Sequence, residues 1–408
     1  MSFHNGLVLS GGGAFAAYEV GVLKALMTGA APFTRHRRID ADVVTGTSAG
    51  SYNGAMLVSR WAMDPAEAIA DMERVWLEEV PGGACGDAVY RWRGSPFVLL
   101  DVDCFLENPA RFFWLRVEDT AFFARSLFRR ARVFLESGDP IEQRFLELLN
   151  FSNLISTYPF PDLIRRTVDF ESIRRSDVKF QAIATNWKSG ESREFHNEDL
   201  DEQSGPLIIM ASSAIPGIFP PVDIPPHIFV DGGVLMNTPL APAIHAGATH
   251  LHVVYLDPDI KSIPLSDLET TLNSLQRTMA ISFAAVVERD IRDAERINKA
   301  IELWEQGVRS GELTAVGARD VGRITDIFQK LESGRKLRKI SIHRYRPRTL
   351  LGGTLGMLNF SAEQSRDLIE RGYRDAVEHD CARDGCVLPA GGPDEPEEAF
   401  YGEAGSGR

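Results

Sequence analysis

The sequence predicts an α/β fold of three layers, α/β/α, with a mostly parallel central sheet and helical insertions. Short apolar runs of strand length, such as 7–10 and 251–257, alternate along the chain with segments whose apolar residues recur at helical spacing, such as 20–27. Alternation of this kind indicates parallel strands covered by helices on both faces. The length of 408 residues is ample to bury a core.

The composition indicates a soluble globular protein. Hydrophobic residues make up 44% of the chain and charged residues 25%, both near ordinary values. The net charge of -13 argues against a protein that coats nucleic acid with its surface, because that role needs basic stretches to neutralise phosphates. We therefore expect no nucleic-acid partner. The sequence is compatible with a homo-oligomer.

The four cysteines contain neither a Cys-x-x-Cys pair nor a dense framework: Cys85, Cys104, Cys381 and Cys386. This pattern predicts free thiols in a reducing compartment and no zinc site. The N-terminal residues 1–5 lack the basic region of a signal peptide, and no apolar run reaches the roughly 18 residues of a membrane-spanning helix. We expect a cytoplasmic protein or one that contacts membranes peripherally.

A serine between two glycines follows the apolar run 41–44, in the segment Gly46-Thr47-Ser48-Ala49-Gly50. The residues after it, 51–57, are helix-like. A serine at a sharp strand-to-helix turn has the layout of a nucleophile elbow. The glycines fit that layout because the tight turn leaves no room for a Cβ. The five-residue pattern is weak by itself, so its meaning depends on the rest of the chain.

A second glycine-rich turn, Gly11-Gly12-Gly13, lies between the strand 7–10 and a helix. A nucleotide P-loop is excluded because no Gly-Lys-Ser/Thr closes it. A dinucleotide fingerprint is formally present through Ala16, but the next strand ends in the serine turn instead of an acidic residue for a ribose. The remaining functional interpretation is an oxyanion hole, in which backbone N–H groups at a helix N-terminus face negative charge. A connector without a ligand is the alternative.

The second half of the chain continues the alternation of strands and helices. A strand is expected at 178–186 with 194–196 beside it, then a short helix stopped by prolines within 206–222. The strand that follows, 228–231, delivers Asp231 into a turn made by Gly232 and Gly233. Asp-Gly-Gly is also ordinary turn chemistry, so this aspartate gains meaning only with the other two segments.

The region 97–165 predicts a helical insertion rich in phenylalanine and arginine, with 11 of the 23 phenylalanines of the chain. Such a segment can lie in a lipid interface or line an acyl pocket. Apolar stripes are more often core, and we favour that interpretation for Phe122, Phe123 and Phe128.

The C-terminal part is expected to close the fold. A helical segment with charged faces spans about 265–335, and a strand begins at 340. Ser361 is the expected N-cap of a last helix, with Gln364 completing a capping box. Residues 388–408 read as a disordered acidic tail.

With these three segments in order, the chain resembles the patatin-like phospholipases. That family combines a glycine-rich oxyanion loop, a Gly-x-Ser-x-Gly elbow and an Asp-Gly-Gly or Asp-Gly-Ala motif. Similar supporting context lies at 17–23, 211–221 and 237–239. The resemblance covers roughly 6–260 and implies one domain over 1–380. One departure concerns the loop, where Phe15 and Ala16 replace the usual basic residue and glycine, which removes any help from a cation.

The resemblance implies a catalytic dyad with Ser48 as nucleophile and Asp231 as base, without a histidine, a metal or a cofactor. It implies backbone donors for an oxyanion at Gly11, Gly12, Gly13 and Ala49, and turn support from Gly46, Gly50, Gly232 and Gly233. A carboxylate with a reference pKa of about 3.9 is a poor base in water. We therefore expect a partly desolvated site that raises the pKa of Asp231.

The expected function is a lipid acyl hydrolase of the phospholipase A or lysophospholipase type, acting on phospholipid or another acyl lipid. One alternative is an acyltransferase that uses the same dyad. Another is a catalytically weak, membrane-binding member of the family. If a histidine completed a triad, the class would instead be an α/β-hydrolase or acyltransferase; the candidates are His196, His227, His245, His250 and His252.

Overall fold

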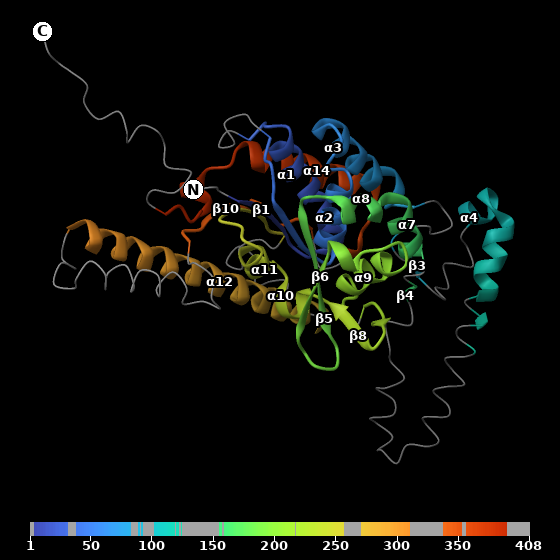
Figure 1. The fold of residues 1–408 in the computed structure, drawn as a ribbon. Helices are drawn as coiled ribbons and strands as arrows, with labels where there is room; N and C mark the ends of the chain where they lie inside the picture. Colours follow the sequence, from blue (N-terminus) through green and yellow to red (C-terminus); the bar gives the residue numbers. More distant parts are fainter. Residues whose placement is uncertain are drawn as a thin grey trace, which may run out of the picture.

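A computed structural model shows how the elements are arranged in space (Figure 1). It describes residues 4–31, 38–82, 89, 91–92, 102–118, 120–121, 124, 155–156, 159–216, 218–256, 271–310, 338–352 and 356–389.

A central sheet of eight strands organises the described part of the chain, in the order β10-β9-β1-β2-β5-β8-β7 with β6 paired to β5. Strands β10, β9, β1, β2 and β5 form a parallel set. Strands β6 and β8 pair antiparallel with β5, and β7 pairs antiparallel with β8. Their bounds are β1 Asn5–Leu9, β2 Val43–Thr47, β5 Lys179–Asn186, β6 Ser192–His196, β7 Val222–Ile224, β8 His227–Asp231, β9 His250–Val254 and β10 Ser341–Tyr345.

The strand register brings the three glycine-containing turns together at the C-terminal ends of the parallel strands β1 and β2. Leu9 at the end of β1 lies opposite Gly46 near the end of β2. On the other side of β2, Thr47 lies opposite Ile183 of β5, and the next residue of β5, Ala184, lies opposite Asp231. Because β8 runs antiparallel to β5, its C-terminal residue arrives beside the C-terminal end of β2. The serine and aspartate turns therefore flank the same point of β5.

Helices cover both faces of the sheet, which confirms the predicted three-layer α/β/α fold (Figure 1). Leu7 and Leu9 belong to one apolar core, whereas Val8, between them, belongs to the other, as strand alternation requires. The first core packs against α1 Ala17–Met27, α2 Ala49–Ser59, α3 Pro65–Arg74 and α14 Ala362–Val377. The second includes residues of α11 Leu240–His245 and α12 Thr271–Ser310, and the short α10 Gly233–Met236 contacts α12.

Short elements complete the described fold. The first core also takes residues from α7 Pro159–Thr167, α8 Phe170–Arg175 and α9 Ser204–Ser212. The others are η1 Gly13–Ala16, the π-helical turn η3 Val75–Glu79, η6 Asn197–Asp199, η10 Gly356–Leu358, α4 Val102–Glu107, α15 Cys381–Asp384 and a separate pair of strands, β3 Arg91–Trp92 and β4 Ile155–Ser156.

The phenylalanine-rich region is partly described, and its described helical stretch is not a core. Phe105 is 41% exposed and Phe113 is 60% exposed. Phe160, at the other end of the region, is buried. The predicted core residues Phe122, Phe123 and Phe128 lie outside the described residues.

The C-terminal part closes the fold as a strand and a helix. Ser361 caps α14 by accepting a hydrogen bond from the Gln364 N–H at 3.3 Å. The predicted capping box is wrong, because the Gln364 side chain turns away and donates to the Gly356 carbonyl at 2.8 Å. Ordered chain continues beyond residue 380, since Val387 pairs with Ile342 of β10. Of the predicted tail, 390–408 lie outside the described residues.

The cysteines differ from the prediction of four free thiols. Cys104 is disulfide-bonded, whereas Cys381 and Cys386 are free. Because disulfides persist mainly in oxidising compartments, the cysteines do not indicate a reducing compartment. None of the described helices combines the length and apolar character of a transmembrane span.

Candidate active site

Ser48 occupies a strained turn between β2 and α2. Its backbone has φ 56° and ψ -128°, and it is the one described non-glycine residue with positive φ. Such a conformation persists only where the surroundings enforce it. Here the enforcement is close packing, because a Cβ on Gly46 would clash with the backbone of Gly50, and a Cβ on Gly50 would lie 2.6 Å from the Leu9 carbonyl oxygen. This is the geometry of the predicted elbow.

Asp231 ends β8 with a buried carboxyl group. Its Oδ1 accepts a hydrogen bond from the Gly233 N–H at 2.7 Å. Burial raises the pKa of Asp231 to about 7, although hydrogen bonding by Gly233 and by the Ser48 side chain acts in the opposite direction. The pKa elevation agrees with the prediction of a desolvated carboxylate.

The second carboxyl oxygen of Asp231, Oδ2, is buried and makes no fully formed hydrogen bond with a described residue. The Ser48 hydroxyl lies near enough to lower the pKa of this carboxyl group, but no hydrogen bond of ordinary geometry joins it to Oδ2. Catalytic hydrogen bonds are often loose before substrate binds. No hydrogen bond joins a described histidine to Ser48 or Asp231, so a histidine triad has no support in the geometry.

The glycine loop contacts the loop that follows Asp231. The Gly11 N–H donates to the Asn237 carbonyl at 3.0 Å, and the Asn237 side-chain amide donates back to the Gly11 carbonyl at 3.1 Å. Gly11 was predicted as an oxyanion donor, but its N–H is already engaged, so its role is to anchor the loop. The N–H groups of Gly12, Gly13 and Ala49 make no hydrogen bond with another described residue. Gly13 and Ala49 line the same cavity as Ser48.

Ser212 connects the nucleophile turn to the aspartate turn. Its Oγ accepts a hydrogen bond from the Ser48 N–H at 2.9 Å and donates to the Ile183 carbonyl of β5 at 2.6 Å. Its backbone carbonyl accepts from the Gly232 N–H at 3.3 Å. The role of Ser212 was not predicted from the sequence, because its partners are distant along the chain.

A buried network supports the helix that follows the glycine loop. Glu19 accepts a hydrogen bond from the Asn53 amide at 2.8 Å, and the Asn53 oxygen accepts from the Trp76 indole at 2.8 Å. Burial raises the pKa of Glu19 well above its ordinary value. The network was not predicted, and it links α1 and α2 to an aromatic wall of the cavity.

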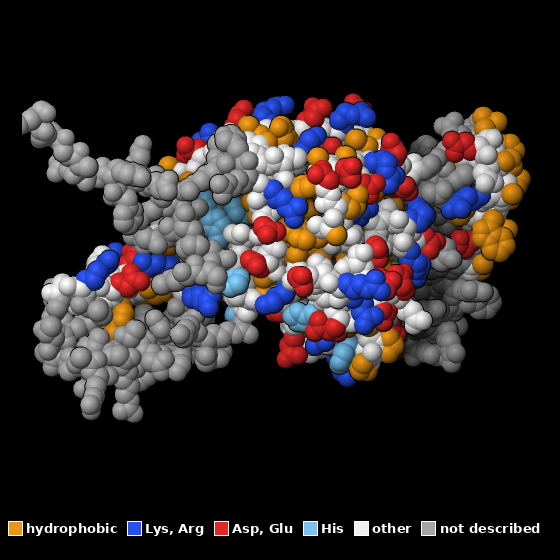
Figure 2. Space-filling view, turned by 45° about the horizontal axis from the view of Figure 1, so that its top comes forward, with side chains coloured by type: hydrophobic (Ala, Val, Ile, Leu, Met, Phe, Trp, Pro, Cys, Tyr) orange, Lys and Arg blue, Asp and Glu red, His pale blue; other side chains and the backbone are white. Residues whose placement is uncertain are grey.

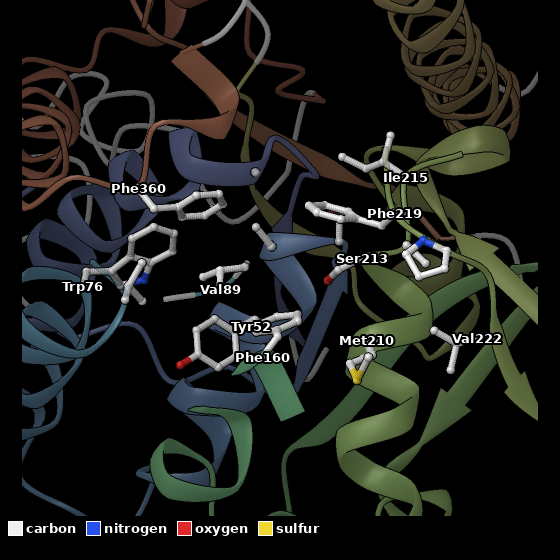
Figure 3. Close-up of a pocket in the computed structure, with 16 residues that line it drawn as sticks. Tyr52, Trp76, Val89, Phe160, Met210, Ser213, Ile215, Phe219, Val222 and Phe360 are labelled. Carbon is white, nitrogen blue, oxygen red and sulfur yellow. The ribbon is translucent and has the colours of Figure 1, made fainter. Parts of the chain in front are cut away.

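The cavity beside Ser48 is lined mainly by apolar side chains (Figure 3). Trp76 and Phe360 stack with ring centroids 6.4 Å apart, and Tyr52 meets Phe160 edge to face at 5.8 Å. Ser213 adds a hydroxyl to the wall. Further apolar lining comes from Val80, Val89, Met210, Ala214, Ile215, Phe219, Pro220 and Val222.

The C-terminal part covers the glycine loop. The Phe15 ring lies close to Gly352 and Gly356, where an added Cβ would be 3.1 and 3.0 Å from the ring. Gly13, with φ 59°, has no room for a side chain because the Met357 carbonyl lies against it. The aromatic residue that replaces the usual basic one thus packs against this C-terminal segment.

Comparisons with known proteins identify the family of this chain. The sequence profile described as patatin-like phospholipase matches residues 7–244, more than half of the chain. NTE family proteins of Mycobacterium bovis and Mycobacterium tuberculosis are 26% identical over 183 residues, which is 44% of this chain and 47% of theirs. The chain thus spans about half the length of these curated relatives. A crystal structure of VipD from Legionella pneumophila aligns with TM-score 0.37 and 17% identity, covering 92% of this chain and 66% of that one.

The strand-to-helix serine turn, the glycine loop and the buried aspartate lie together at one edge of a three-layer α/β/α fold. The chain belongs to the patatin-like phospholipase family. The members of this family are, as a class, lipid hydrolases.

We expect the Asp231→Asn substitution to stabilise the fold increasingly between pH 4 and 7. The pKa of this carboxyl is about 7 in the folded protein and about 3.9 in an unfolded chain. Between those values the folded state binds more protons than the unfolded state, so the wild type loses stability as the pH rises. The advantage of the variant should level off above pH 7, at no more than about 4 kcal/mol. Urea denaturation across this pH range measures it.

The matched control is Asp223→Asn, which removes an exposed carboxylate from β7. A stability difference for Asp231→Asn that did not vary with pH would contradict a desolvated carboxyl group.

We expect Ser212→Ala to lower the free energy of unfolding and to slow the labelling of Ser48 by a fluorophosphonate probe. The substitution leaves the Ser48 N–H without its acceptor, and a buried unpaired group costs about 1–3 kcal/mol. Ser59→Ala is the control, because that hydroxyl donates to the Met56 carbonyl within its own helix. Unchanged labelling and stability in Ser212→Ala would rule out its positioning role.

Proposed function

We propose that this protein is a serine acyl hydrolase of the phospholipase A or lysophospholipase type, which cleaves carboxylic esters of lipids through an acyl-Ser48 intermediate. One observation carries the proposal. A serine in an enforced elbow lies beside a buried carboxyl group with a pKa of about 7, at the wall of an apolar cavity. In the proposed mechanism, the serine is the nucleophile, the carboxyl group is the base and the cavity wall is the acyl-binding surface.

In the proposed first step, the Ser48 oxygen attacks the ester carbonyl while its proton passes to Asp231. A serine hydroxyl is a weak nucleophile without such a base, and a base works best when its pKa lies near the working pH. Oδ2 is suited to take the proton, because Oδ1 is held by Gly233. The tetrahedral oxyanion would accept hydrogen bonds from the N–H groups of Gly12, Gly13 and Ala49.

Collapse of this intermediate breaks the ester bond, and the leaving alcohol takes the proton from Asp231. In the second half of the cycle, water attacks the acyl-Ser48 carbonyl and gives a proton to Asp231. Release of the fatty acid returns that proton to the Ser48 oxygen. The scheme balances with water as the only co-substrate, and an alcohol in place of water would make the same site a transferase.

The apolar lining of the cavity favours a fatty acyl chain as its occupant. Aromatic and aliphatic side chains dominate its wall, so a hydrocarbon chain would bury apolar surface there at roughly 25 cal/mol per Å². Phe15 supplies no cation near the glycine loop. We therefore propose that headgroup charge contributes little to recognition at this position and that acyl-chain burial contributes more.

Peripheral membrane contact is proposed through the exposed helical residues after Cys104. Leu106, Trp114 and Val117 are 71%, 69% and 62% exposed. Figure 2 shows hydrophobic side chains gathered at the end of the molecule where α4 lies, with basic side chains beside them. Exposed aromatic and aliphatic groups with nearby arginines suit the interface of a lipid bilayer.

We expect Ser48→Ala and Asp231→Asn each to abolish release of fatty acid from phospholipid vesicles.

For the wild type, kcat/KM should rise with pH and level off above an apparent pKa of about 7, because the base must be ionised. A fluorophosphonate should label the wild type and not Ser48→Ala. Full activity in either variant would exclude the dyad, and acyl transfer to an added alcohol in preference to water would reassign the reaction as a transferase.

We expect the double variant Phe113→Glu and Trp114→Glu to bind vesicles of phosphatidylcholine and phosphatidylglycerol about a hundredfold more weakly than the wild type. Fully burying a large apolar side chain is worth about 1.5–3 kcal/mol, or roughly tenfold or more per residue. Trp187→Glu is the matched control, since that residue is 55% exposed but lies after β5. If Trp187→Glu weakened vesicle binding as much as the double variant did, the helical residues around Phe113 and Trp114 would not be the part that docks on the bilayer.

A further inference from the structure

Two thiols and two imidazoles meet at the edge of the sheet that is farthest from β7. The residues are His343 on β10 and His379, Cys381 and Cys386 in the segment after α14, and one ligand atom of each lies within 4.8 Å of all the others. His343 and the His379 side chain are each about 1% exposed. None of these groups belongs to the proposed catalytic site, which lies three strands away on β2.

The distances between these atoms fit tetrahedral coordination of a metal ion. Cys381 Sγ lies 3.4 Å from His343 Nδ1 and 3.5 Å from His379 Nε2, and Cys386 Sγ lies 3.3 Å from His379 Nε2. For zinc with bonds of about 2.3 Å to sulfur and 2.05 Å to nitrogen, a tetrahedron puts neighbouring S and N atoms about 3.6 Å apart. The side chains thus converge with little adjustment needed.

Neighbouring polar groups orient the His379 ring and the Cys386 thiol, as neighbouring groups orient the ligands of a structural metal ion. The other nitrogen of His379, Nδ1, lies 2.9 Å from a carboxylate oxygen of Asp384, so Nε2 is the nitrogen that faces the two cysteine sulfurs. A carboxylate behind a ligating histidine fixes its tautomer and ring orientation. The Arg344 N–H points at Cys386 Sγ at 3.4 Å, which suits a thiolate.

The short loop between the two cysteines is built to bring both sulfurs to one side. α15 spans Cys381–Asp384, and Gly385 ends it in a left-handed conformation with φ 68°. The chain then returns, so that the Cys386 N–H donates to the Cys381 carbonyl at 3.0 Å. The spacing Cys-x₄-Cys falls within the range used by structural zinc sites.

We infer that His343, His379, Cys381 and Cys386 form a structural zinc site that fastens the C-terminal segment to the edge strand β10. Two thiolates and two imidazoles in a tetrahedral arrangement favour Zn²⁺ over Mg²⁺ or Ca²⁺, which prefer oxygen ligands. Four protein ligands leave no open position, so the ion would hold structure and take no part in ester cleavage.

The site would also protect an exposed sheet edge. Beyond β10, the backbone pairs only with Val387 among described residues, through hydrogen bonds of 2.8 and 2.9 Å with Ile342. An ion that holds Cys386 beside this pairing would keep the segment over the strand, as edge strands require. The sequence did not predict this zinc site, because one ligand comes from a strand that is far along the chain from the other three.

The test begins with the full-length protein purified under reducing conditions without chelator. Elemental analysis should find one zinc per chain. The metal-free protein titrated with Co²⁺ should develop thiolate-to-metal charge-transfer and tetrahedral ligand-field absorption. Removing zinc should lower the melting temperature, and Zn²⁺ but not Mg²⁺ should restore it.

Variants assign the site. Cys381→Ser together with Cys386→Ser should bind no zinc, and Asp384→Asn should bind it about 10–100-fold more weakly while keeping all four ligands. His250→Gln is the matched control, because its ring centroid lies 4.9 Å from that of His343 but it is outside the four-residue cluster. It should retain one zinc.

Absence of zinc and of Co²⁺ charge-transfer bands in the reduced protein would overturn the inference. Zinc retained by the double cysteine variant would do the same, as would a Cys381–Cys386 disulfide in protein kept under reducing conditions. Ester hydrolysis is a separate readout, so an inactive protein that binds zinc would contradict only the proposed function.

Discussion

The burial of the Asp231 carboxyl group is the constraint on which the site depends. Asp231 is removed from solvent by strands on one side and by the loop after it on the other, and only one of its oxygens has a complete hydrogen bond. Burial raises its pKa to about 7 because the charged form is poorly solvated there. The pKa stays raised only while the surrounding backbone excludes solvent, so the packing around Asp231 sets the protonation of this carboxyl group.

The surrounding backbone is held by hydrogen bonds that cross between segments distant in sequence. Ser212 joins the end of α9 to Ser48, to β5 and to the aspartate turn, and Asn237 joins that turn to Gly11. Thr45 adds a bond from β2 to the Pro239 carbonyl at 2.9 Å. Each contact fixes one turn against another, which allows a strained Ser48 backbone to persist in a single conformation.

Much of the fold and the three turns could be predicted from sequence, because strands, helix caps and glycine turns have local signatures. Ser48 and Asp231 were proposed as a dyad from the family resemblance, and the raised pKa of Asp231 was expected with them. The donor assignment at Gly11 could not be made correctly, because its N–H is taken by a residue far along the chain. The same reason explains why Ser212, the contact of Phe15 with Gly352 and the cysteine-histidine cluster were missed. The free-thiol prediction failed at Cys104 because pairing depends on distances that sequence does not reveal.

The contact of Phe15 with the C-terminal segment ties the glycine loop to the cavity wall. The Phe15 ring touches the segment that also presses the Met357 carbonyl against Gly13, and Phe360 from the same region forms part of the cavity wall. The glycine loop and the cavity wall therefore share one supporting segment, in a part of the chain that begins about a hundred residues after the family match ends.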